Sequence, residues 1–178
     1  MPRRKRPMGQ GRYLYTRTWT KAVDDVFIDA LSFMAMKGRN QSNRRMADLP
    51  SLNFALDKVN TYAGRNWHGH FIKRKLCLLR VRYHTFRKVI AHHSISWNEN
   101  TNRMRGPWEE WSRIIRERPF AKAYYYCGER KWEQMKEIFG GNSILSSSED
   151  TSRLYDSTAE SSDAPQMGCD VLRQMKVA

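Results

Sequence analysis

Apolar residues recur at spacings of four and three along residues 68–90. The six positions are Ile72, Leu76, Leu79, Tyr83, Phe86 and Ile90. At 100° per residue they form one narrow stripe, which predicts a long helix from about His68 to Ile90 that packs along its length. Basic residues flank the stripe on both sides, and the sequence has no acidic residue between Asp57 and Glu99. Such a helix is typical of a protein that contacts DNA or RNA, whereas an ordinary solvated face mixes both signs of charge.

Two shorter amphipathic segments precede the long helix. The first begins near Thr20, a candidate N-cap, and ends at Lys37-Gly38. The second follows Ser51, a second candidate N-cap, and ends at Gly64. Residues 38–50 are polar and predict an exposed loop, and residues 65–67 predict a short turn. Helix, helix, tight turn and basic helix is the order expected of a helix-turn-helix DNA-binding domain.

Both ends of the chain differ in composition from its middle. Residues 1–18 are basic, contain Gly9 and Gly11 and offer too little surface to bury, so we expect a flexible arm there. Its first basic run is a candidate nuclear-localisation signal that could also contact phosphates, formed by Arg3, Arg4, Lys5 and Arg6. Residues 141–178 are polar and acidic and predict a disordered tail. The expected organisation is therefore an arm at 1–18, a folded domain at 19–140 and a tail at 141–178.

The net charge strengthens the case for a nucleic-acid partner. The chain has 178 residues, a formal net charge of +14 and a pI near 10.0. Residues 140–178 hold three basic and six acidic residues, so the positive charge lies in the rest of the chain. The three cysteines form no CxxC pair, and no apolar run reaches the roughly 18 residues of a membrane span. We expect a soluble nuclear or cytosolic protein in a reducing compartment.

The sequence offers little that could support catalysis. His92-His93 lacks metal-ligand spacing with any cysteine, and Glu109 and Glu110 would diverge by 100° on a helix. There is no phosphate-cradling glycine loop and no nucleophile elbow. We therefore expect no enzymatic activity, no metal or cofactor, no small-molecule substrate and no membrane partner.

Candidate DNA contacts follow from positions on the long helix and near it. Base contacts need side chains near its start that point away from the core, and these are His70, Lys73, Arg74 and Cys77. For Arg74 a base contact and a phosphate contact are equally compatible with the pattern. The phosphate candidates are Arg12, Arg17, Arg65, Lys75, Arg80 and Arg82. Such contacts would make binding depend steeply on salt.

Six tryptophans could stack on the bases of a single strand, or they could form the core. They are Trp19, Trp67, Trp97, Trp108, Trp111 and Trp132. The core is favoured, because Trp108 and Trp111 recur with Ile115 on one helical stripe. At least one residue of Tyr124-Tyr125-Tyr126 should be exposed.

Several motifs occur in the order of a known family. Trp19-Thr20, the turn from Gly64 to Trp67, and Ile72-Lys73-Arg74-Lys75-Leu76 through Tyr83 resemble the plant Myb/SANT-like DNA-binding domain. That family is related to the Myb and trihelix folds and is linked to Harbinger-type transposable elements. Downstream, Trp97-Asn98, a fourth helix from Met104 to Ile115, the turn at Pro119-Phe120-Ala121-Lys122 and a closing helix from Trp132 to Gly140 also match. Ser94 and Ser96 stand where the family usually has glycines.

The resemblance covers about residues 18–140 and implies both a fold and a function. It implies an all-α, helix-turn-helix fold: a three-helix core, a long basic third helix and two additional C-terminal helices. It also implies a nuclear, sequence-specific, double-stranded DNA-binding protein, either a transcription regulator or a transposon-derived accessory protein. The alternative is a protein-interaction adaptor, in which Asp24, Asp25 and Asp29 would dock basic partners such as histone tails, ribosomal proteins or a transposase. RNA binding is a third possibility, on charge alone.

Overall fold

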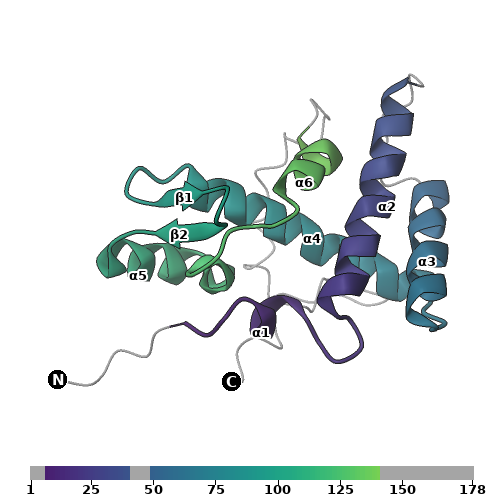
Figure 1. The fold of residues 1–178 in the computed structure, drawn as a ribbon, viewed down its shortest axis with the longest axis horizontal. Coiled ribbons are helices and arrows are strands. Elements are labelled where there is room, and N and C mark those ends of the chain that lie inside the picture. The colour runs from purple at the N-terminus through teal and green to yellow at the C-terminus, as the bar shows by residue number, and fades with distance from the viewer. Residues whose placement is uncertain (1–6, 41–48, 141–178) are drawn as a thin grey trace, which may run out of the picture.

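Three helices form the part of the fold that the sequence pattern predicts. The computed structural model describes residues 7–40 and 49–140, in which α2 is Lys21–Asn40, α3 is Leu49–Ala63 and α4 is Gly69–Ile90. Helices α2 and α3 lie side by side, and α4 extends away from them toward a hairpin (Figure 1). The expected nuclear-localisation run and tail lie outside the described residues.

Two of the predicted helix ends are confirmed by the structure, and two are wrong. Thr20 caps α2, since its Oγ1 accepts the Val23 N–H at 3.4 Å. Gly64 ends α3 with a φ of 58°, and the Arg65 N–H donates to the Asn60 carbonyl at 3.1 Å. However, α2 continues through Gly38, because one glycine costs a helix only about 1 kcal/mol. Ser51 lies inside α3, so its prediction as an N-cap was wrong.

The apolar stripe of α4 faces the core, as predicted. Ile72, Leu76, Leu79, Tyr83 and Phe86 are all buried, while Ile90 is partly buried. Val89 is buried as well. The long helix therefore contributes one side to the hydrophobic core along most of its length.

The N-terminal segment is not a flexible arm throughout. A short helix, α1 (Gly11–Leu14), packs against the rest, and Leu14 is only 3% exposed. The Gln10 side chain donates to the Gly128 carbonyl at 2.9 Å. The prediction of an arm over residues 1–18 was wrong for this part, because Tyr13, Leu14 and Tyr15 supply apolar surface that the basic composition obscured.

A small hairpin separates α4 from the C-terminal helices, and the sequence did not predict it. Strands β1 (Ser96–Asn98) and β2 (Arg103–Arg105) are antiparallel, with Trp97 opposite Met104. They are followed by α5 (Trp108–Glu117), a 3-10 helix η1 (Pro119–Tyr124) and α6 (Trp132–Phe139). The predicted fourth helix thus begins four residues later than expected. The fold is otherwise mostly helical, with the expected three-helix core and two further C-terminal helices.

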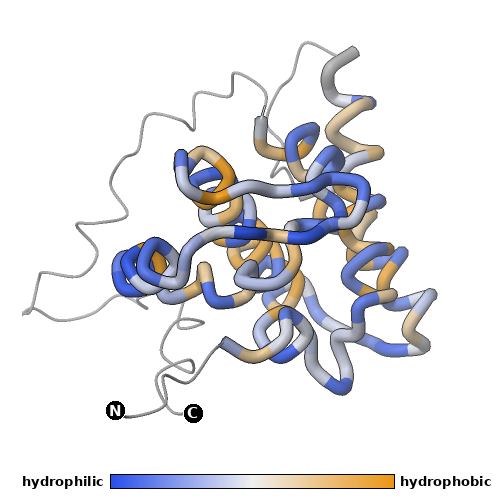
Figure 2. The backbone as a smooth tube through the Cα atoms, turned by 60° about the vertical axis from the view of Figure 1, so that its left-hand side comes forward, coloured by the Kyte–Doolittle hydropathy of each residue, from blue (hydrophilic) through white to orange (hydrophobic). Residues whose placement is uncertain are grey.

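The tryptophans belong largely to the core rather than to a stacking surface. Trp19, Trp111 and Trp132 are buried, and the other three are partly buried. The indole of Trp97 meets the Phe86 ring edge-on at 5.0 Å, which joins the hairpin to α4. Tyr124 is buried and Tyr126 is 43% exposed, as the sequence requires. Figure 2 shows hydrophobic positions recurring along the helices, while the turn of the hairpin is hydrophilic.

Two glycines that border helices should differ in how their substitution changes stability. Gly64→Ala should lower the free energy of unfolding by about 1–3 kcal/mol, because alanine is strained at a φ of 58°. Gly69→Ala, in the first turn of α4, should leave stability unchanged or raise it by about 0.4–1 kcal/mol, since nothing lies within 4 Å of an added Cβ. Urea denaturation of both variants measures this, and equal effects would contradict it.

Candidate nucleic-acid interface

The side of α4 that faces away from the core is cationic. We call the α4 outer face the set His70, Lys73, Arg74, Cys77, Arg80, His84, Arg87 and Lys88. Cys77 is partly buried and the other seven residues are exposed. Val81 packs against the hydrophobic core instead. Within residues 7–40 and 49–140, none of the five lysines and arginines on this face forms an ion pair with a carboxylate. Their charge is therefore available to an external anion.

The periodicity of α4 arranges this face in rows. Lys73, Arg80 and Arg87 are seven residues apart, so they follow one line with steps of about 10.5 Å. The four candidate base-contacting residues, His70, Lys73, Arg74 and Cys77, share the first turns of the same face. The structure brings these four side chains together; their contact with bases stays a prediction.

Arg82 is not on the surface, and its prediction as a phosphate contact was wrong. It is only 2% exposed. Its Nη1 lies 2.6 Å from Asp24 Oδ2, and its Nη2 lies 2.8 Å from Glu129 Oε1. The position of Arg82 beside the apolar stripe points it between α2 and the segment before α6, where these carboxylates hold it.

Further hydrogen bonds complete the network around Arg82. The Trp19 indole donates to Asp24 at 2.9 Å, and the Tyr124 hydroxyl donates to Glu129 at 3.0 Å. Burial alone would lower the pKa of Arg82, but Glu129 and Asp24 outweigh it and hold that pKa well above its ordinary value. Burial and the Glu129 carboxylate together raise the pKa of Tyr124 well above its ordinary value. Arg82 therefore stays charged and ties α4 to α2 and to residues 124–129.

Lys75 also contributes to packing rather than to an open surface. Its ammonium lies 4.7 Å from the centre of the Trp19 ring and 5.3 Å from that of Phe71. The side chain is half-buried, and burial lowers the pKa of Lys75. A cation over an aromatic face is stabilised by the ring quadrupole, so Lys75 helps to hold α4 against Trp19. Its expected role as a phosphate contact stays a prediction.

The remaining phosphate candidates are exposed but are not gathered on one surface. Arg65 lies in the turn that leads into α4, close to its first turn. Arg12 belongs to α1, which packs against η1, and its Nη1 lies 3.0 Å from Met8 Sδ. Arg17 is exposed in the segment between α1 and α2. Arg80 is thus the candidate that α4 itself positions, and Arg65 lies four residues before the helix.

Residues 18–114 match the model of the Myb/SANT-like DNA-binding domain, which is more than half of the chain. The chain belongs to the Myb/SANT-like DNA-binding domain family. No curated protein and no solved structure matches it. The family is one of DNA-binding domains and is not enzymatic. In the described part of the chain, no helix is both long enough and apolar enough to cross a membrane.

The family match ends within α5, whereas the buried network of this Myb/SANT-like domain reaches further. Tyr124 and Glu129 follow the matched residues, and Glu129 makes two hydrogen bonds to Arg82. Residues 115–140 therefore help to hold α4.

The three aspartates considered as a docking site for basic protein partners pair with basic side chains of this chain. Asp24 is buried against Arg82. Asp25 pairs with Arg130 at 2.5 Å, and Asp29 pairs with Lys131 at 2.7 Å. Burial therefore excludes Asp24 from an open acidic docking face, while Asp25 and Asp29 each have a cation of this chain beside them.

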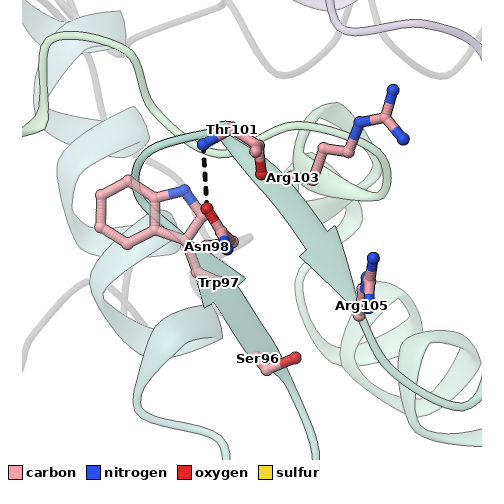
Figure 3. Close-up of a pocket in the computed structure, with 6 residues that line it drawn as sticks. All are labelled: Ser96, Trp97, Asn98, Thr101, Arg103 and Arg105. Carbon is pink, nitrogen blue, oxygen red and sulfur yellow. Dashed lines mark hydrogen bonds between the residues drawn. The ribbon is translucent and has the colours of Figure 1, made fainter.

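An open depression of about 610 Å³ lies at the hairpin (Figure 3). Its lining consists of Ser96, Trp97, Asn98, Thr101, Arg103 and Arg105. The Thr101 N–H donates to Asn98 Oδ1 at 2.9 Å, and the Trp97 indole donates to Asn102 Oδ1 at 3.1 Å. Met104 is buried while Arg103 and Arg105 are exposed, so the two guanidinium groups lie on the side of β2 opposite the core. Strands of three residues are too short for an alternating pattern, which is why sequence analysis missed this surface.

Two arginines two positions apart on α4 should differ sharply in their effect on folding. Arg82→Ala leaves the Asp24 and Glu129 carboxylates buried without a cation, so the free energy of unfolding should fall by about 3–5 kcal/mol. Arg80→Ala, which removes the same charge from an exposed position, should change it by less than about 0.5 kcal/mol. Chemical denaturation followed by circular dichroism tests this; an equally mild loss in both variants would refute the buried network.

Proposed function

We propose that this chain is a nuclear protein that binds double-stranded DNA in a sequence-specific manner through the α4 outer face. The observation that carries the proposal is that the basic residues of this face are exposed and unpaired with the chain's own carboxylates in the described residues. Membership of a DNA-binding domain family supports it. The net charge of +14 supports it as well, because a polyanion attracts such a chain before any specific contact forms.

In the proposed complex the first turns of α4 enter the major groove. Arg74 or Lys73 donates hydrogen bonds to guanine, a contact that discriminates between bases by about 1–3 kcal/mol. His70 and Cys77 lie beside them on the same face. Arg65, Arg80 and Arg17 neutralise phosphates and position the helix without contributing to sequence preference.

The cellular role that fits this activity is that of a transcription regulator or of a transposon-derived DNA-binding accessory protein. The basic run Arg3-Arg4-Lys5-Arg6 would direct the chain to the nucleus. The adaptor alternative has less support, because the aspartates on which it depended are paired with Arg82, Arg130 and Lys131.

Selection of binding sites from random duplex DNA tests the proposal. The chain should enrich one motif, and Lys73→Ala or Arg74→Ala should reduce the preference at one or two positions by about 1–3 kcal/mol per contact. Arg105→Ala removes one exposed charge from β2 and should leave the motif unchanged, because the proposed base contacts come from α4 and not from the hairpin. If no motif is enriched, and duplex binds no more tightly than single strands or RNA, the proposal is wrong.

A further inference from the structure

The C-terminal half of α4 carries a second group of cations around His84. Arg80 precedes His84 by four residues, and Arg87 and Lys88 follow it by three and four, so all three lie within one turn of it on the helix surface. Arg118 is exposed and lies directly before η1, which packs against α4, so a different part of the chain contributes a cation beside this helix. Residues far apart in the sequence thus meet at one cationic surface.

The pKa of His84 reflects the same group of cations. Partial burial lowers the pKa of its imidazole, and the four strongest charge effects on it come from Arg80, Arg87, Arg118 and Lys88. All four are cations and all lower that pKa further. The local potential is therefore positive enough to oppose protonation of a histidine whose edge reaches solvent.

We infer that His84 and Arg118, together with Arg80, Arg87 and Lys88, form a second phosphate-binding site for the backbone of the duplex that the first turns of α4 engage. This inference rests on the proposed function. It adds one residue that the family model does not include, since the match ends at Ile114 and Arg118 lies beyond it.

The dimensions of α4 and of DNA favour a backbone ligand at this place. The helix has 22 residues and is therefore about 33 Å long. The major groove is only about 12 Å wide, so a straight helix whose axis crosses the groove extends past the edge of the groove. His84 lies 11 residues beyond Lys73, or about 16 Å further along the axis. At that distance the helix meets the phosphates that border the groove.

Other charges near His84 leave the site cationic. On α6, which packs against the same stretch of α4 through Tyr83 and Trp132, Glu133 is paired with Lys136 at 2.7 Å. Glu117 precedes Arg118 at the end of α5 and is exposed. The Tyr83 ring lies 5.3 Å from the imidazole. A phosphate at this surface would offset the repulsion from four cations, so His84 should gain a proton when DNA binds.

A salt titration with matched arginine variants of the full chain tests the site. The logarithm of the association constant falls with the logarithm of salt concentration by about 0.9 for each neutralised phosphate. Arg118→Ala should flatten this slope by about 0.9, whereas Arg116→Ala, an exposed arginine two residues earlier on α5, should leave it unchanged. Circular dichroism confirms that both variants fold.

The outcomes separate this inference from the proposed function. If the unmodified chain fails to bind duplex DNA, both the proposed function and the second site are refuted. If the chain binds DNA with a selected motif, but Arg118→Ala and Arg116→Ala keep the same slope, only the second site is refuted.

The pH dependence of binding gives a second, independent readout. Because phosphate raises a pKa that is lowered in the unbound chain, affinity should increase as pH falls from 8 toward the ordinary histidine value of 6.5 and below. A gain of up to about tenfold corresponds to a rise of one pKa unit on binding. His84→Gln should remove most of this gain, and His93→Gln, an exposed histidine after α4, should retain it. An identical pH profile in His84→Gln and in the unmodified chain would overturn the assignment of His84.

Discussion

The guanidinium of Arg82, held between Asp24 and Glu129, is the contact on which the geometry of this domain depends. A buried charge is costly unless ion pairs and hydrogen bonds compensate for it, and here both carboxylates bind the same side chain. The contact joins residues that lie 58 and 47 positions from Arg82 in the chain. It fixes the rotation of α4 about its own axis, so that the basic residues on the opposite side of the helix face solvent.

The distribution of acidic residues explains why that face remains cationic. Asp24 and Glu129 neutralise Arg82, while Asp25 and Asp29 pair with Arg130 and Lys131. These carboxylates are used within the fold, and the sequence around α4 contributes none of its own. Residues beyond the family match supply Glu129, Arg130 and Lys131. The C-terminal segment therefore contributes to the interface indirectly, by orienting α4 and by engaging acidic residues of α2.

Sequence periodicity predicted local structure well and long-range partners poorly. The stripe from Ile72 to Phe86 and the stop at Gly64 depend on neighbours within a few residues, so α4 and the end of α3 were predictable. The same periodicity predicted on which side of the helix Arg82 lies. It could not predict that Asp24 and Glu129 lie on that side. The two strands were too short to show alternation, and three apolar residues within a basic segment, Tyr13, Leu14 and Tyr15, were enough to fold α1 onto the domain.

Nuclear magnetic resonance of the isotopically labelled full chain, titrated with duplex DNA, tests the central claim most directly. The account predicts that backbone signals of the α4 outer face shift, while the Arg82 Nε–H signal is slow to exchange with solvent both before and after DNA is added. If the signals of the outer face stay in place while those of the hairpin or of the outer sides of α2 and α3 move, or if the Arg82 Nε–H exchanges freely in the unbound chain, the account is contradicted.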